Sequence, residues 1–179
     1  IFDKDLVIEK FDLANVLPNP AIFDTTKLLW MNGQYIRNIA NDDFVNSALD
    51  KISQDLEREL FDKEISRINK ILPSVQERIE TLNDLTPQIK FLLDEPFEVN
   101  QEEWDSVNSE AGQSYLVSIR ETIKSMDDFS LTNIENIMRE ELKNKEMKPK
   151  IGFQITRVSL TGTKVSPPLF ESIYALGKD

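Results

Sequence analysis

The chain has 179 residues with 40% apolar and 30% charged side chains, a balance typical of a folded cytosolic protein of one domain or two small ones. The absence of His and Cys excludes histidine-based catalytic triads, most zinc sites and all disulfide scaffolds. The net charge of -11 argues against non-specific nucleic-acid binding, and neither a long apolar run nor a signal-peptide pattern occurs. We therefore expect no membrane or metal contacts, and a location in the cytoplasm or an organelle matrix.

Helices are expected to dominate, because glycine is scarce and apolar residues mostly recur three or four positions apart. A first helix is predicted over 44–60, after Asp42 and Asp43, whose carboxylates favour a helix N-terminus. A second helix follows and is predicted to end or kink at Pro73. The inward positions of these two helices are Val45, Leu49, Ile52, Leu56, Leu60, Ile65, Ile68 and Leu72.

Two more helices are predicted before a boundary. One starts at Ser74, and a short one covers 86–95 with Pro87 in its first turn. The acidic stretch DEPFEVNQEEWD at 94–105 contains a proline and shows no period, so it is the expected boundary between two lobes. The inward positions of the helix from Ser74 are Val75, Ile79 and Leu82.

Two amphipathic stripes follow this boundary, and both have helical spacing. Ser130 and Asp127 are candidate caps for the second of them. The stripes are Tyr115, Ile119, Ile123 and Met126, then Leu131, Ile134, Met138 and Leu142. The pattern as a whole predicts an all-α fold with two helical lobes.

The stretch 149–160 is ambiguous by periodicity. Ile151, Phe153 and Ile155 alternate as in a strand. Ile151, Ile155 and Val158 also fit one face of a helix. Periodicity alone does not distinguish the two structures.

Positive charge gathers in one part of this acidic chain. Between Lys143 and Lys164 there is a single acid, Glu146. Such a basic tract suits a partner that is met at one place only. Its cations are Lys143, Lys145, Lys148, Lys150, Arg157 and Lys164.

Two further sets of residues favour structural roles. Adjacent acids on a helix point about 100° apart, so the acidic pairs are interpreted as caps and solvated turns rather than as a metal or hydrolytic site. These pairs are Asp42–Asp43, Glu102–Glu103, Asp127–Asp128 and Glu140–Glu141. Aromatic side chains can stack bases, but here they are scattered, and we expect most of them in the core. They are Trp30, Tyr35, Trp104, Tyr115 and Tyr174.

The stretch GTKVSPP, which starts at Gly162, predicts a short rigid loop between two helices. Gly162 suits a helix C-cap, whereas Pro167 and Pro168 cannot continue a helix but can open the next one. With Arg157 and Lys164 beside it, such a loop can receive an unstacked base. The same residues also fit an ordinary helix–helix turn.

Two long motifs resemble one known family. FDTTKLLWMNGQYIR at 23–37 is similar to the FD-x-x-KL-x-WMNG-x-YIR signature that follows the catalytic half of bacterial-type glutamyl-tRNA synthetases. RVSLTGTKVSPPLFESIYALGKD at 157–179 is similar to their R-x-ALTG-x-x-x-x-P-x-LFE-x-x-x-LLGK signature. The resemblance implies two all-α anticodon-binding lobes of the helical-bundle or α-cage type. The implied parts are 1–38 for the end of the stem-contact region, 39–96 for the first lobe and 97–179 for the second.

The resemblance also implies a parent protein that is a glutamate–tRNA ligase using ATP and Mg²⁺ in a catalytic half outside this chain. Since the chain starts at Ile1 rather than Met and has no catalytic motif of that family, we expect a fragment with no catalysis and no cofactor of its own. The family pattern continues past Asp179 into a final helix. The implied partner is tRNA(Glu), and we expect a monomer.

The resemblance carries anticodon-reading roles onto five residues. Arg78 in ERIETL matches the Arg that lies against the third anticodon base. By helical geometry Arg78 lies at the edge of the apolar stripe, with its guanidinium either free or in a surface salt bridge. The residues matched to the first two bases are Arg157, Ser166, Pro167 and Leu169, and the supporting basic tract is Lys143, Lys145, Lys148, Lys150 and Lys164. Two departures from the family pattern are Ser159 in place of Ala and Pro168 in place of Gly, which stiffens the loop.

A different class of function stays open. An acidic surface and amphipathic helices also fit a helical protein–protein docking module without RNA binding. That module predicts no salt-dependent RNA binding and no effect of removing the basic tract.

Overall fold

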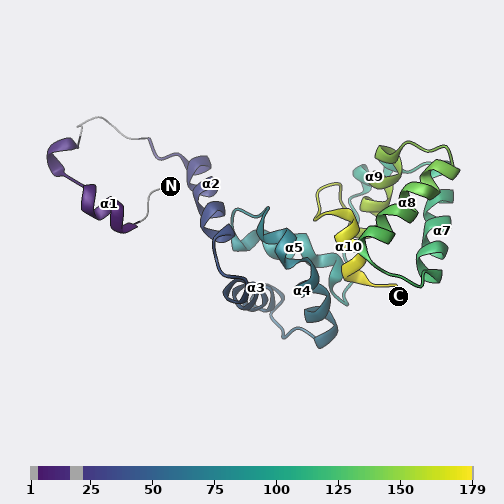
Figure 1. Cartoon of the computed structure of the whole chain (residues 1–179), viewed down its shortest axis with the longest axis horizontal. Helices are drawn as coiled ribbons and strands as arrows, with labels where there is room; N and C mark the ends of the chain where they lie inside the picture. The colour runs from purple at the N-terminus through teal and green to yellow at the C-terminus, as the bar shows by residue number, and fades with distance from the viewer. Residues whose placement is uncertain (1–3, 17–21, 179) are drawn as a thin grey trace.

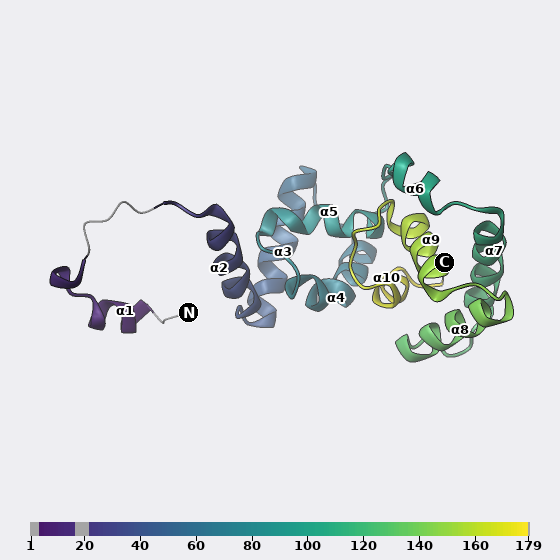
Figure 2. The ribbon, with the colours of Figure 1, turned by 90° about the horizontal axis from the view of Figure 1, so that it is seen from above.

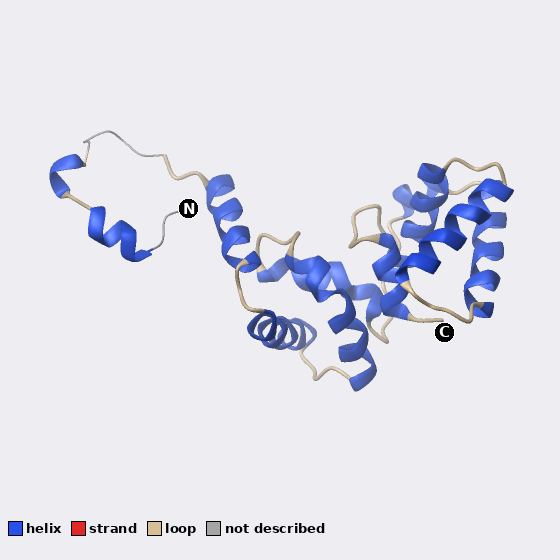
Figure 3. Ribbon diagram, in the orientation of Figure 1, coloured by secondary structure: helices blue, strands red, loops and turns tan. Residues whose placement is uncertain are grey.

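The computed structural model describes residues 4–16 and 22–178, and every regular element in these two ranges is a helix (Figure 3). The α-helices are α1 Lys4–Lys10, α2 Thr25–Arg37, α3 Asn41–Leu56, α4 Asp62–Gln76, α5 Leu85–Ile89, α6 Gln101–Val107, α7 Glu110–Ser125, α8 Leu131–Asn144, α9 Pro149–Thr161 and α10 Leu169–Leu176. Short 3₁₀ helices are η1 Leu13–Asn15, η2 Leu82–Asp84 and η3 Lys90–Leu92. The all-α prediction is confirmed. Figures 1 and 2 show three parts in a row: an N-terminal part with α1 and α2, a first lobe from α3 to η3, and a second lobe from α6 to α10.

Two separate clusters of buried apolar side chains form the interior. The first lies among α3, α4, α5 and η3, and the second among α7, α8, α9 and α10. Fully buried residues of the first are Phe44, Ala48, Ile52, Ile68, Ile71, Leu72, Leu85, Ile89, Leu92 and Ala175. Those of the second are Tyr115, Ile134, Met138 and Ile155. The stripes predict the second cluster well, through Tyr115, Ile134 and Met138, but of the fully buried residues of the first cluster they predict only Ile52, Ile68 and Leu72. The other predicted positions of the first two helices, Val45, Leu49, Leu56, Leu60 and Ile65, are only partly buried.

Helix α10 joins the two clusters. Leu169 and Ile173 on this helix belong to the second cluster, whereas Ala175 belongs to the first and Leu176 packs against it. The ring of Tyr174 lies under the ammonium of Lys70 on α4, at 5.4 Å from nitrogen to ring centroid. The lobes are therefore held against each other by one helix with two apolar faces.

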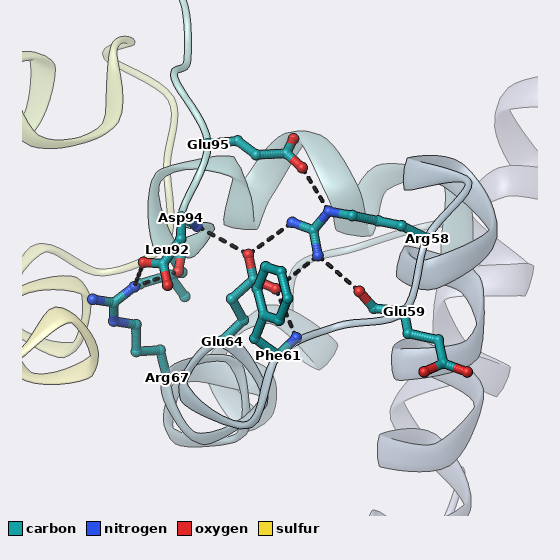
Figure 4. Close-up of polar contacts among 8 residues, drawn as sticks. All are labelled: Arg58, Glu59, Phe61, Glu64, Arg67, Leu92, Asp94 and Glu95. Atoms are coloured by element: carbon teal, nitrogen blue, oxygen red, sulfur yellow. Dashed lines mark hydrogen bonds and ion pairs between the residues drawn. The ribbon is translucent and has the colours of Figure 1, made fainter.

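The connection between the lobes is the segment 93–100, between η3 and α6. A buried carboxylate fixes its start (Figure 4). The Glu64 side chain has no exposed surface and accepts two hydrogen bonds from the Arg58 guanidinium, at 2.8 and 2.9 Å. It also accepts from the backbone N–H of Phe61 and of Asp94, each at 2.9 Å. The hydrogen bonds from Arg58 lower the pKa of Glu64 most, burial raises it, and the two backbone N–H groups lower it further. The net result is a Glu64 pKa of about 2. Asp94 is thus tied to α4 through its own backbone.

Two flanking ion pairs extend this contact along the connection. Arg58 Nε donates to Glu95 at 2.6 Å, and Arg67 Nη1 donates to the Asp94 carboxylate at 2.6 Å and to the Leu92 carbonyl at 3.1 Å (Figure 4). Since these groups come from the loop after α3, from α4 and from the segment after η3, the second lobe starts from a fixed point on the first.

The N-terminal part leaves most of its apolar residues exposed. Helix α1 has no buried residue, and α2 buries only Gly33 and Ile36. Trp30 and Tyr35 on α2 are exposed, so the expectation of core packing is wrong for these two aromatics, although Tyr115 is fully buried. No helix in the described ranges combines the length and the apolar character that crossing a bilayer requires.

The prediction that one helix ends at Pro73 and another starts at Ser74 is wrong. Helix α4 continues through Pro73 to Gln76, so no separate helix starts at Ser74. Pro73 itself is exposed, whereas Leu72 and Val75 on either side of it are buried. The helix continues because burial of this apolar face outweighs the one backbone hydrogen bond that Pro73 cannot donate.

Two other sequence stretches become helices. The ambiguous stretch 149–160 lies in α9, which has Pro149 in its first turn. The acidic stretch at 94–105 contains the start of α6, whose N-terminus is capped by Asn100 through a 3.0 Å bond from the backbone N–H of Glu103. A helix this short shows too little of the helical period to be detected from sequence.

Candidate nucleic-acid interface

Arg78 lies in the turn directly after α4. Its backbone N–H donates to the Val75 carbonyl at 2.9 Å, which closes the end of the helix. The residue is exposed, and its side chain forms no ion pair with any residue in the described ranges. The guanidinium is therefore available to an external partner rather than occupied by a surface salt bridge.

Arg157 on α9 fixes the loop that precedes α10. Its Nη1 donates to Ser166 Oγ at 2.7 Å, to the Pro167 carbonyl at 2.8 Å and to the Ser166 carbonyl at 3.4 Å. A cation with several hydrogen bonds to one loop restrains it strongly. Ser166 and Pro167 are buried in this arrangement.

The two arginines lie close enough for their charges to interact. The pKa of Arg157 is lowered from its ordinary value, first by burial and then by the positive charge of Arg78. Arg78 belongs to the first lobe and Arg157 to the second. Two cations from different lobes whose charges interact, with Arg78 in no ion pair in the described ranges, favour an anionic or hydrogen-bond-accepting ligand nearby.

The loop at 162–168 that precedes α10, called the Pro loop below, presents a different surface from the one its sequence suggests. Leu169 is buried in the second cluster, and the Ser166 hydroxyl points inward to Arg157 and the Pro167 carbonyl. Val165 is the most exposed apolar side chain of the loop, at 79%. Val165 is not among the site residues that the sequence predicts, because its only signal is an apolar residue between Lys164 and the turn.

The basic tract does not form one patch. Lys143, Lys145, Lys148 and Lys150 lie at the end of α8 and the start of α9, whereas Lys164 lies beyond the other end of α9. Thirteen residues of α-helix separate these ends by roughly 18 Å, at about 1.5 Å per residue. Lys164 is thus the one lysine of the tract that shares the loop with Ser166.

Gly162 ends α9 as the sequence predicts, in the left-handed conformation with φ 79°. A Cβ built there would lie 2.7 Å from the Glu98 carbonyl oxygen, so the loop and the connection between the lobes touch at this point. The backbone N–H of Asn100 also donates to the Gly162 carbonyl at 2.9 Å. The connection, α6 and the Pro loop therefore form one packed unit.

Gly162→Ala is expected to lower the free energy of unfolding by about 2 to 3 kcal/mol, since it combines left-handed strain with a backbone clash. Gly177→Ala is a control without a clash: no described atom lies within 4 Å of a Cβ there, but φ 90° and ψ -170° form a conformation that glycine alone favours, so backbone strain of about 1–3 kcal/mol applies by itself. Urea denaturation measures both. A loss of only about 1 kcal/mol for Gly162→Ala, the strain of the left-handed conformation alone, would contradict the contact with Glu98.

Comparison with known proteins identifies the fold that carries this interface. The family model of the anticodon binding domain matches residues 43–179. Glutamate–tRNA ligases from Cutibacterium acnes and Symbiobacterium thermophilum are 34% and 30% identical over 99% and 98% of this chain, and the chain spans 37% of the length of each.

Solved structures agree in fold. The crystal structure of a glutamate tRNA ligase from Elizabethkingia meningosepticum superposes with a TM-score of 0.80 at 23% identity, covering 97% of this chain and 34% of that one. Glutamate-tRNA synthetase from Elizabethkingia anophelis gives a TM-score of 0.75 over 97% of this chain and 33% of that one. The chain belongs to the anticodon binding domain family, in the form that glutamate–tRNA ligases contain.

Proposed function

We propose that this chain reads the anticodon of tRNA(Glu) for a larger glutamate–tRNA ligase. The observation that carries the proposal is a pair of arginines from different lobes: Arg78 is exposed and forms no ion pair in the described ranges, and Arg157 holds the Pro loop through its hydrogen bonds. Reading adjacent bases requires groups from both lobes to be held at a fixed spacing, and α10 and the Glu64 contact supply that restraint.

The two arginines have different tasks in this proposal. Arg78 offers an unpaired planar guanidinium to the third anticodon base, where it can donate two parallel hydrogen bonds. Arg157 shapes the Pro loop, so that unstacked first and second bases meet a rigid surface beside Lys164. The acidic remainder of the chain disfavours unrelated RNA elsewhere on the surface.

Catalysis belongs to another part of the proposed parent protein. ATP and Mg²⁺ would act there, and this chain contributes specificity. Within the described ranges no group of three or more acidic side chains gathers closely enough to hold a metal ion. A monomeric, cytoplasmic ligase completes the proposal.

Arg78→Ala is expected to weaken binding of tRNA(Glu) by about 1–3 kcal/mol, the value of one good paired contact to a base. A tRNA with its third anticodon base changed should show little further loss with this variant, because the same contact is already absent. Fluorescence titration at two salt concentrations measures both effects. Lys148→Ala is the charge control, because it lies at the far end of α9 from the Pro loop and should weaken both tRNAs equally.

The docking-module alternative gives opposite results. Equal binding to both tRNAs by the unaltered chain at low salt, or additive losses from Arg78→Ala and the base change, would contradict anticodon reading by Arg78.

A further inference from the structure

Two side chains of α2 donate to the carbonyls on either side of Arg78. Asn32 Nδ2 donates to the Glu80 carbonyl at 2.5 Å, and Arg37 Nη1 donates to the Glu77 carbonyl at 3.3 Å. Among the residues that the structure describes, no backbone N–H donates to either carbonyl. A polar backbone group outside regular structure needs such a partner to stay in one orientation.

The backbone of α2 approaches the same turn closely. A Cβ built at Gly33 would lie 3.3 Å from the Ile79 carbonyl oxygen, so a glycine suits the crossing. In return, Gln76 Nε2 donates to the carbonyls of Ile36 and Ile39 at 2.9 and 3.0 Å. Hydrogen bonds thus run in both directions between α2 and the segment that contains Arg78.

The opposite side of the turn is restrained as well. Asp84 Oδ2 accepts from the backbone N–H groups of Glu80 and Thr81, at 3.1 and 2.8 Å. Between them, Asp84 and Asn32 bind both the N–H and the carbonyl of Glu80. Loss of the α2 contacts would leave the turn held from one side only.

We propose that Asn32 and Arg37 are positioning residues that fix the direction of the Arg78 side chain toward the third anticodon base. This inference rests on the proposed function. It assigns a physical role to the WMNG motif at 30–33: the motif places α2 against the turn at 77–81. Third-base reading then depends on an asparagine far from Arg78 in sequence.

The test uses Asn32→Asp, which keeps the shape of the side chain but replaces the donor with a carboxylate facing a carbonyl oxygen. Asn38→Asp is the matched control: it makes the same chemical change at the C-cap of the same helix, where Nδ2 donates at 2.9 Å to the Gln34 carbonyl within α2 rather than to the turn after α4. Two quantities are measured: amide hydrogen exchange in peptides covering 76–84, and the ratio of affinities for tRNA(Glu) and its third-base variant.

Asn32→Asp is expected to speed exchange in 76–84 and to reduce the third-base affinity ratio about tenfold, close to the effect of Arg78→Ala. Asn38→Asp should change neither quantity. A merely structural role predicts faster exchange or lower stability with an unchanged ratio.

The inference is overturned if Asn32→Asp leaves amide exchange in 76–84 unchanged. It is also overturned if the unaltered chain discriminates between the two tRNAs and Asn32→Asp leaves the affinity ratio unchanged. If the unaltered chain binds both tRNAs equally, the proposed function fails and the assigned role for Asn32 fails with it. Exchange then still reports whether α2 holds the turn, so the two failures are distinguishable.

Discussion

Glu64→Gln is expected to lower the free energy of unfolding by about 3 kcal/mol, among the largest effects of any single polar substitution in this chain. The Glu64 carboxylate is fully buried and is the acceptor in all four of its hydrogen bonds. Two of these come from Arg58 and one each from the backbone N–H groups of Phe61 and Asp94. Each carboxylate oxygen accepts two of these bonds, so the NH₂ group of a Gln amide would face two donors in either orientation. The charge pairing and two of the four hydrogen bonds are therefore lost together. Urea denaturation followed by circular dichroism measures the change.

Glu95→Gln is the matched control within the same contact. Glu95 also pairs with Arg58, but its side chain is 48% exposed, and exposed pairs contribute less than about 1 kcal/mol. A loss for Glu95→Gln as large as that for Glu64→Gln would contradict the role of burial.

The same contact predicts a pH dependence of stability. The folded-state pKa of Glu64 is about 2, below its ordinary value of 4.5. The carboxylate therefore stabilises the fold above about pH 5, and this contribution is lost as the pH falls from there towards 2. Glu64→Gln should lack this component, so its stability should fall less steeply with acid than that of the unaltered chain. Parallel curves for the two proteins would contradict this assignment.

Ala175→Asp is expected to separate the lobes. Ala175 is fully buried, on a helix of the second lobe but within the cluster of the first. A carboxylate there would be buried without a partner, which costs about 3 kcal/mol or more unless water enters. Parting of the lobes relieves that cost, so small-angle X-ray scattering should show a larger radius of gyration. tRNA affinity should fall as well, because Arg78 and Arg157 would no longer be held together.

Ala111→Asp is the control for the added charge. Ala111 is exposed in the first turn of α7, where an acid is mildly favourable. This variant should keep the radius of gyration of the unaltered chain. An unchanged radius for Ala175→Asp as well would show that α10 is not what holds the lobes together.

Much of the helical framework could be predicted from the sequence. The stripes Tyr115–Met126 and Leu131–Leu142 repeat with the helical period, and Gly162 has the conformation that a C-cap requires. Local signals of this kind depend on residues within a few positions of one another, so periodicity and capping rules detect them.

The rest depends on contacts between residues that lie far apart in sequence. Pro73 permits continuation of α4 only because its neighbours are buried by other helices. Ser166 and Leu169 match a binding motif, yet their side chains face inward, because Arg157 and the second cluster draw them there. The role of Asn32 is visible only once α2 lies against the turn after α4.

The sharing of α10 between both clusters has a consequence for synthesis. Ribosomes make chains from the N-terminus at roughly 5–20 residues per second, so Ala175 emerges on the order of ten seconds after Leu92 completes the first lobe's own helices. During that interval the first cluster lacks Ala175 and Leu176 and exposes part of its apolar surface. The first lobe is then a candidate client for chaperones on the ribosome, and it reaches its final packing only after nearly all of the second has been translated.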